Sequence, residues 1–369
     1  MKFSCDKTLL QRNISITAKA ASPRSPIPAL EGVLLEAGQG TLKLTGYDLK
    51  KGIYTRMEAE VPEMGSIILP ARMFNDIVHA LPDGEVTIQT QGLNTTIRCA
   101  SAEFHIVGSD AADYPELPSI DGAEGVSLPQ NQLSRMIRQT IFAVSDNESR
   151  PVYTGELFDL SEGTLTIVAI DGYRMALRRE KVEGLENELS FIVPGSALND
   201  LEKLCADTED PVQINLGSKH ISFTLEDTVL ISRRLEGEFL NYKRTVPASF
   251  QVTVRADARE LQRTIERVSL IIDDKIKNPL RCTFRDGELR IICATAKGKA
   301  EDYCRLDGDG GNVEIGFNNR YLLDALRAAP ADELRVCLNN GSSPCVLFPA
   351  DENDDGFVYM ILPVRLRAE

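Results

Sequence analysis

The sequence predicts an α+β protein built from three tandem copies of one domain. The chain has 369 residues, which is too long for one ordinary domain. A strand that begins with glycine recurs at Gly40, Gly163 and Gly287, at intervals of 123 and 124 residues, and one third of the chain is 123 residues. Each third also combines helical and strand-like patterns in the same order.

Each copy is expected to contain two amphipathic helices. In the first helix, apolar residues recur every three or four positions around Leu10, Leu133 and Leu261, as on the buried face of a helix. The second helix follows the end of a strand and begins near Leu69, Val193 and Ile315. These three positions are 124 and 122 residues apart, close to the spacing of the glycine-led strands.

Short strands occupy the rest of each copy. Runs such as EVTIQT and ISFTLE alternate apolar and polar residues, a pattern that predicts half-buried strands, about eight per copy. Stretches rich in glycine, proline and acidic residues lie near Ala123 and Pro247 and indicate boundaries. The predicted domains are therefore residues 1–122, 123–246 and 247–369.

Composition restricts the class of protein. No apolar run is long enough to span a membrane, and the opening residues show no apolar stretch followed by a cleavage site. The eight cysteines form no C-x-x-C pair, and most lie in apolar, strand-like runs. We therefore expect buried, reduced thiols in a cytoplasmic protein.

The net charge of −14 argues at first against a nucleic-acid partner, because phosphates attract cations. Net charge is an average, however, and does not say which surface carries which sign. In the first helix of the third copy, Leu261 and Ile265 share one face. Arg259, Arg263 and Arg267 lie almost opposite that face, at 100° per residue.

The same segregation of charge recurs on the other helices. Arg135 and Arg138 point away from the core together with Gln139 in the second copy, and Arg12 and Lys19 do so in the first. The second helices carry bases at Arg72, His79, Lys203, Arg320 and Arg327. Lysine and arginine often occupy the wet side of a helix, but their repetition on six helices of an acidic chain predicts helices that face an anion.

Several motifs together resemble the bacterial DNA polymerase III β subunit family. They are RSPIPALEGVLLEA, LTGYDL, LPARMFNDI, IDGYRMAL, IGFNNRYLLDAL and the terminal YMILPVRL, and they span all three copies in order. The resemblance implies three DNA-clamp domains per chain, with helices lining a pore. Two chains would join head to tail into a ring around duplex DNA, bound without sequence specificity. It implies a non-catalytic processivity factor whose partners are the polymerase III α subunit, the clamp loader and other clamp-binding proteins.

The resemblance also implies contact residues. Those that match DNA-contacting positions of the family are Arg24, Arg72 and Lys203. A pocket for short linear peptides is expected between the second and third domains, where apolar anchors enter a cleft and arginine and asparagine fix the peptide backbone. The matching residues are Tyr153, Ile170, Gly172, Tyr173, Arg174, Met175, Leu240, Arg244, Thr245, Asn318, Tyr321, Met360, Ile361, Leu362, Pro363, Val364 and Arg365.

The pocket motifs depart from the family pattern. The family's common TDGHRL is IDGYRM here, so that Tyr173 replaces histidine and Ile170 replaces threonine. Leu240 stands where proline is common, and Arg367 to Glu369 extend past the usual end. The peptide preference therefore stays open. The terminal segment also fits a final core strand in which Tyr359 and Ile361 point inward and their neighbours stay accessible.

The resemblance places Phe104 and Ile106 against Leu270 and Ile271 of a neighbouring chain. AEFHIVGS alternates like a strand, and at a domain edge such a strand offers unpaired backbone groups. Three consecutive apolar residues end the helix that leads to Ile271, which is more than one core-facing stripe uses. All four side chains could alternatively belong to cores within the domains.

Helix packing supports a ring of two chains. Helices pack roughly 10 Å apart, so six in a circle leave a hole of about 9 Å, and twelve leave about 28 Å. The groove depths of B-DNA sum to about 16 Å. Two chains are therefore the smallest ring of this unit that surrounds a duplex.

No catalytic or metal-binding pattern is present in the sequence. The three histidines have no metal-ligand spacing with cysteine or carboxylate, and no nucleotide-binding loop or nucleophile elbow occurs. We expect no cofactor, no metal and no enzymatic activity. Two other classes stay open: an acidic scaffold that binds only proteins, and an enzyme whose site is scattered across domain clefts.

Overall fold

The computed structural model describes residues 1–120, 124–182, 188–273 and 278–366. The chain forms two compact units. Unit 1 comprises Met1–Leu133 and Asp200–Arg234, and unit 2 comprises Ser134–Asn199 and Leu235–Glu369. The middle third of the chain therefore contributes strands to both units.

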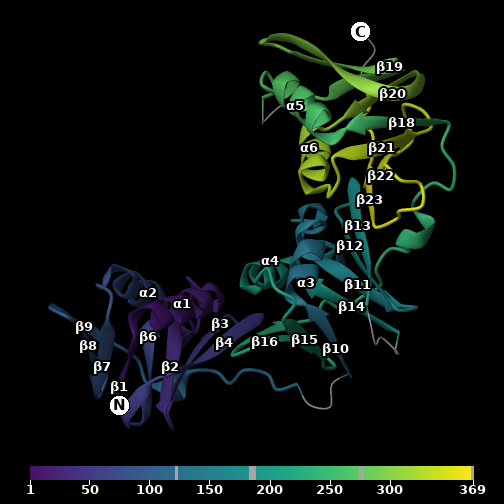
Figure 1. Ribbon diagram of the computed structural model, residues 1–369. Coiled ribbons are helices and arrows are strands. Elements are labelled where there is room, and N and C mark those ends of the chain that lie inside the picture. The colour runs from purple at the N-terminus through teal and green to yellow at the C-terminus, as the bar shows by residue number, and fades with distance from the viewer. Residues whose placement is uncertain (121–123, 183–187, 274–277, 367–369) are drawn as a thin grey trace. The chain divides into compact units, whose positions relative to one another are not determined.

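Two α-helices occur in each third of the described chain, as the sequence predicts. They are α1 (Lys7–Thr17), α2 (Ala71–Ala80), α3 (Gln130–Arg138), α4 (Gly195–Leu204), α5 (Ala258–Ser269) and α6 (Asn319–Ala328) (Figure 1). The Asp6 carboxylate caps α1 by accepting the N–H groups of Thr8 and Leu9, and Asp257 caps α5 through the N–H of Glu260. An aspartate at the end of a strand thus fixes where each of these helices begins.

The predicted helix faces agree with the observed burial, with one exception. Leu261 and Ile265 of α5 are buried, and Arg263 is exposed. Gln139 was expected to point outward with Arg135, but it is buried. Because α3 ends at the preceding residue and the chain then turns, the helical period cannot be extended to Gln139.

Unit 1 contains two antiparallel sheets. One has the order β5 (Glu60–Glu63), β1 (Lys2–Asp6), β7 (Glu85–Gln91), β8 (Asn94–Cys99) and β9 (Ala102–Val107). The other has the order β10 (Glu124–Pro129), β15 (Pro211–Leu216), β16 (His220–Leu225), β17 (Thr228–Arg233), β4 (Lys51–Glu58), β3 (Thr41–Tyr47), β2 (Gly32–Gly38) and β6 (Gly65–Pro70). Helix α1 packs on β3 and β4 of the second sheet.

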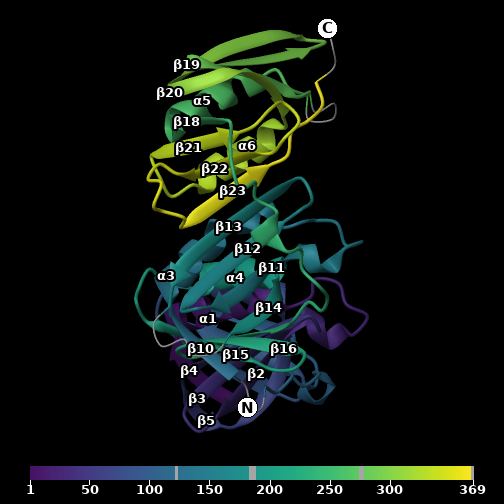
Figure 2. The same cartoon turned by 90° about the vertical axis from the view of Figure 1, so that its right-hand side faces the viewer.

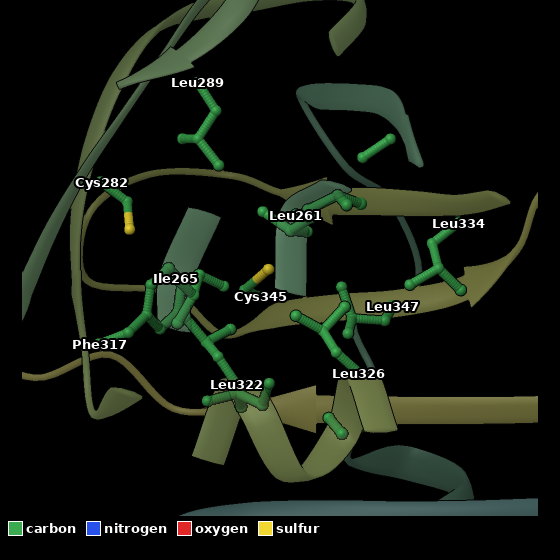
Figure 3. Packing of buried hydrophobic residues seen from close by; sticks show 14 of the residues in the cluster. Leu261, Ile265, Cys282, Leu289, Phe317, Leu322, Leu326, Leu334, Cys345 and Leu347 are labelled. Carbon is green, nitrogen blue, oxygen red and sulfur yellow. The ribbon is translucent and has the colours of Figure 1, made fainter. Parts of the chain in front are cut away.

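Unit 2 contains one long antiparallel sheet, which can be followed in Figure 2. Its order is β14 (Leu189–Pro194), β11 (Gly155–Ser161), β12 (Thr164–Ile170), β13 (Arg174–Lys181), β23 (Phe357–Ile361), β22 (Cys345–Pro349), β21 (Glu333–Leu338), β18 (Val252–Asp257), β20 (Gly298–Phe317) and β19 (Leu280–Thr295). Figure 3 shows side chains of α5 and α6, among them Leu261 and Leu322, packed with Phe317 and Cys345 from the strands. Each such leucine contributes roughly 1.5–3 kcal/mol by burial.

Successive thirds of the chain are joined by strand pairing. In unit 1, β17 of the middle third pairs with β4 of the first third, with Leu230 opposite Ile53. In unit 2, β13 of the middle third pairs with β23 of the last third, with Met175 opposite Met360. Main-chain hydrogen bonds therefore cross from one sequence repeat to the next.

The strand content differs from the expected eight per copy. Within the described residues the first third has nine strands, the middle third eight and the last third six. The last number is low because β19 and β20 run for 16 and 20 residues and form one long hairpin. None of the described helices is long and apolar enough to cross a membrane. Seven of the eight cysteines are buried, Cys205 is half-buried, and all eight are free thiols.

Candidate functional site

The turn that leads into β13 sets the geometry of the site in unit 2. The Asp171 carboxylate accepts hydrogen bonds from the backbone N–H groups of Tyr173 (2.8 Å) and Arg174 (3.0 Å). Gly172 between them has φ +91°, a conformation that glycine adopts without steric cost. The turn therefore holds Tyr173 outward, where 61% of it is exposed.

The Arg174 guanidinium is held by two carboxylates and two rings. Nε donates to Asp171 Oδ2 at 2.9 Å, and Nη1 donates to Asp324 Oδ2 at 2.6 Å. Its Cζ lies 4.6 Å from the ring centroid of Tyr321 and 5.4 Å from that of Phe142. Only 11% of the side chain is exposed, so Arg174 is a rigid part of the site, and its unused N–H groups can serve a ligand's carbonyl oxygen.

Tyr173 stacks on Tyr321, with ring centroids 6.0 Å apart and an interplanar angle of 21°. These two tyrosines form one wall of a pocket of about 440 Å³. The pocket is lined by Val144, Ser145, Asp146, Asn147, Asp171, Tyr173, Arg174, Ile272, Asn318, Asn319, Arg320, Tyr321 and Asp324. Four residues of the predicted peptide site lie here: Tyr173, Arg174, Asn318 and Tyr321.

Other predicted residues lie in a separate apolar cluster. Ile170, Met175 and Met360 are buried there with Leu157 and Tyr242. Along a strand, successive side chains point to opposite faces of the sheet, so Met175 and Arg174 belong to different faces. Within the predicted set, Arg174 therefore lines the pocket and Met175 belongs to the apolar cluster on the opposite face of β13.

The remaining residues of the predicted set outside the C-terminal strand are exposed to solvent or half-buried. Tyr153 packs against Phe239 at the margin of the apolar cluster, with ring centroids 5.5 Å apart. Leu240 is 42% exposed and Val364 is 37% exposed. Arg244 and Arg365 are also exposed, Thr245 is half-buried, and Gly172 is exposed.

The C-terminal segment is tied into unit 2 by its backbone. Leu362 N–H donates to the Tyr173 carbonyl, and Val364 N–H donates to the Gly316 carbonyl, both at 2.8 Å. Leu362 and Pro363 are half-buried, and Ile361 is fully covered. The expectation that alternate residues of this strand stay accessible is wrong, because both faces of β23 are covered and all five of its residues are buried.

Sequence reasoning missed three groups around Arg174. Asp171 precedes a glycine and so carries a turn signal, which could have identified it. Nothing in the sequence pattern connects Arg174 with Asp324, which is 150 positions away, or with Phe142. The last third of the chain, which carries Asp324, is joined to the strand of Arg174 by the pairing of β13 with β23.

The predicted DNA contacts lie at the surface of unit 1. Arg24 is exposed in the loop after α1, and Lys203 is exposed near the end of α4. The Arg72 side chain is 96% exposed on α2, and its guanidinium lies 3.9 Å from the Asp76 carboxylate. Arg72 also lines an open groove of about 1170 Å³ between α1 and α2, together with Lys19.

Several other helix arginines are neutralised by neighbouring carboxylates. Arg135 pairs with Glu180 at 2.9 Å, and Arg267 pairs with Asp302 at 2.6 Å. Burial alone would raise the pKa of Glu180, but hydrogen bonds from Arg135 and Arg178 hold this pKa below its ordinary value. The net positive charge of the helix faces is therefore smaller than the count of their arginines and lysines suggests.

The predicted subunit contacts include the most exposed large apolar side chain among those described. Leu270, at the C-terminal end of α5, is 84% exposed, and Ile271 is half-buried against the core of unit 2. Phe104 and Ile106 are half-buried on β9, which is an edge strand of its sheet.

Comparison with known proteins gives matches along the chain. The DNA polymerase III beta subunit is recognised in three segments: its N-terminal domain at residues 1–118, its central domain at 127–241 and its C-terminal domain at 243–365. A beta sliding clamp of Halalkalibacterium halodurans is 33% identical, over 99% of this chain and 100% of its own length. One from Staphylococcus aureus is 31% identical, over 99% of both chains.

Solved structures agree with these matches. A putative DNA polymerase III beta subunit from Eubacterium rectale has a TM-score of 0.93 at 32% identity, covering 99% of this chain and 100% of its own. A DNA polymerase sliding clamp from Bacillus subtilis has a TM-score of 0.93 at 30% identity, covering 100% of each chain. Since the three domain matches follow the family's order and the relatives align from end to end, the chain belongs to the DNA polymerase III beta subunit family, the bacterial beta sliding clamps.

Proposed function

We propose that this chain is a DNA sliding clamp, a protein without catalytic activity that closes into a ring around duplex DNA and tethers the replicative polymerase. Its similarity to beta sliding clamps over 99% of its length carries the proposal. A ring that surrounds DNA is retained topologically, so weak and sequence-independent contacts with phosphates are sufficient and permit sliding.

The proposed ring consists of two chains, each with domains at residues 1–122, 123–246 and 247–369. Leu270, which is 84% exposed, and the open edge of β9 support a head-to-tail contact between unlike surfaces. Two such contacts related by a two-fold axis would close the ring. Covering a large apolar side chain and completing an edge strand both favour association.

Arg24, Arg72 and Lys203 are proposed to contact DNA phosphates. Their exposure supports this role, and the Asp76 carboxylate at 3.9 Å offsets the Arg72 charge only weakly at a solvated surface. The chain as a whole is acidic, with a net charge of −14. This charge would repel DNA from surfaces that do not carry such bases.

Linear peptides of the polymerase III α subunit, the clamp loader and other clamp-binding proteins are proposed to bind unit 2 around β13 and β23. The rigid Arg174, the exposed Tyr173 and the accessible apolar rim at Leu240 and Val364 support this site. Fixed polar groups beside apolar anchor positions are typical of peptide-binding clefts.

Retention on circular DNA tests the proposal. The full-length protein is loaded onto a closed circular plasmid by a bacterial clamp loader, and the complex is separated from free protein by gel filtration. We expect the protein to stay with the plasmid at a salt concentration that abolishes ordinary phosphate contacts, and to leave after one restriction cut. Equal loss from circular and linear DNA would contradict the proposal and favour a scaffold that binds only proteins.

A further inference from the structure

A cleft of about 820 Å³ lies on the second sheet of unit 1, and none of the predicted contact residues discussed above lines it. The segment 111–120 crosses the sheet and forms one wall, while β2, β3, β4, β15, β16 and β17 form the floor. Tyr114 fixes this segment, because its hydroxyl donates a hydrogen bond to the Thr45 carbonyl oxygen at 3.1 Å. Leu117 lies over Gly52, where a Cβ atom would come within 2.8 Å of it.

The cleft faces away from helix α1. The Thr55 hydroxyl donates to Asn13 Oδ1 of α1, so Thr55 lies on the helix side of β4. Its neighbours Tyr54 and Arg56 line the cleft on the opposite side, as strand alternation requires. A ligand in this cleft would therefore be separated by the sheet from anything bound along α1.

Two cations stand directly opposite each other at one end of the floor. Lys43 on β3 is the register partner of Arg56 on β4, and like charges in such a pair destabilise a sheet. Glu36 on β2 lies 3.0 Å from Lys43 Nζ and neutralises that lysine. Arg56 makes no ion pair with any described residue; its guanidinium lies 5.8 Å from the Tyr54 ring centroid.

Hydroxyl and amide groups continue the floor beyond the cations. Across the strands Thr45 is opposite Tyr54, Tyr54 is opposite Val229, and Val229 is opposite Thr224. In the next row Ser222 is opposite Asn215. The Thr45 side chain is 1% exposed, and its Oγ1 has no hydrogen-bond partner in the described structure. Buried hydroxyls are normally paired.

From this arrangement we infer that the cleft binds an anionic small molecule, with a phosphate or carboxylate group on Arg56 and a polar body over the hydroxyl rows. Because Glu36 already pairs with Lys43, an oxyanion in the cleft would pair with Arg56 through charge-assisted hydrogen bonds. The volume lies within the range of roughly 300–1,000 Å³ that is usual for small-molecule sites. Glu116 also lines the cleft but is exposed, so its charge is screened by solvent. The inference does not depend on the proposed clamp function.

Calorimetric titration of the full-length protein tests the site, with inorganic pyrophosphate as the phosphate probe and citrate as the carboxylate probe. We expect saturable, one-to-one binding of at least one probe. Arg56→Gln should weaken that binding roughly tenfold or more, because it removes a charge-assisted hydrogen bond. Thr224→Val should weaken it less. The control Arg98→Gln removes a strand arginine outside the cleft that pairs with Glu103 and should leave binding unchanged.

The outcomes separate the inference from the proposed function. Circular dichroism first establishes that Arg56→Gln folds like the parent, as expected for an exposed side chain. Absence of saturable binding of both probes, or equal binding by the parent and Arg56→Gln, overturns the inference. Loss of retention on circular DNA in Arg56→Gln also overturns it, because the cleft would then belong to the DNA path.

Discussion

Glu156 on β11 is fully buried, and neither of its carboxyl oxygens has a hydrogen-bond partner in the described structure. Burial raises the pKa of Glu156 to about 8, although the nearby Thr140 hydroxyl lowers it slightly. An unpaired carboxylate at such a position is costly. The folded protein therefore holds Glu156 protonated at neutral pH, whereas the unfolded chain ionises it near the ordinary value of 4.5.

This difference predicts a pH-dependent stability. Between about pH 4.5 and 8 the folded state binds one more proton than the unfolded state at Glu156, so this group's contribution to the free energy of unfolding falls as pH rises. The fall is about 1.4 kcal/mol per pH unit, and up to about 5 kcal/mol over the whole interval. Above the folded pKa the contribution is constant.

Urea unfolding of the parent and Glu156→Gln at several pH values checks the prediction. The glutamine amide does not titrate. The free energy of unfolding of the variant should therefore fall less steeply with pH than that of the parent, even if the variant is less stable at every pH. Glu156→Met, which also removes the buried polar group, should show the same shallow slope. A parent-like pH slope in both variants would show that Glu156 ionises without cost in the fold.

Strand β23 and the residues that follow it connect the fold to the proposed peptide site. Leu362 is half-buried, and its N–H donates to the Tyr173 carbonyl. We expect Leu362→Ala to weaken binding of a polymerase-derived peptide by about tenfold or more, since truncation of an apolar anchor at an interface often costs 1–2 kcal/mol. The backbone hydrogen bond is retained, so the fold should persist.

Fluorescence anisotropy with a labelled peptide measures this effect. Leu93→Ala is the matched control, because Leu93 is 47% exposed in unit 1, outside the proposed site. Unchanged peptide affinity in Leu362→Ala, with Leu93→Ala also unchanged, would remove Leu362 from the site.

The sequence predicts helices better than it predicts strands. The two helices per third and the buried faces at Leu10 and Leu261 follow from a local period of 3.6 residues. Strand pairing depends on distant partners, so no local pattern indicated that β13 pairs with β23 or that the residues next to Tyr359 and Ile361 are also buried. For the same reason Asp324 could not be assigned to Arg174, and the predicted peptide residues could not be divided between two faces.

Closure of the proposed ring depends on the association of two chains. Leu270→Asp introduces a charge at a position where the side chain is 84% exposed in the single chain, so the substitution should not disturb folding. In a dry subunit contact the same charge would be costly. We expect a folded monomer that is not retained on circular DNA.

Sedimentation equilibrium at micromolar concentration distinguishes the outcomes. The control is Leu49→Asp, because Leu49 is 46% exposed in a loop of unit 1 and lies outside the predicted contact. The control should sediment like the parent. A Leu270→Asp variant that remains dimeric would place the subunit contact elsewhere, while leaving the peptide and DNA sites unaffected.

The strand pairs that join successive thirds also determine how the protein can be divided. A middle third expressed alone would lose β4 and β23, and its strands β17 and β13 would each present a row of bare N–H and C=O groups. Such edges are templates for pairing with other molecules. The chain repeats one pattern three times, yet its copies are not independent modules. If one copy were expressed alone within its sequence boundaries, strand edges that are paired in the full chain would become sites of aggregation.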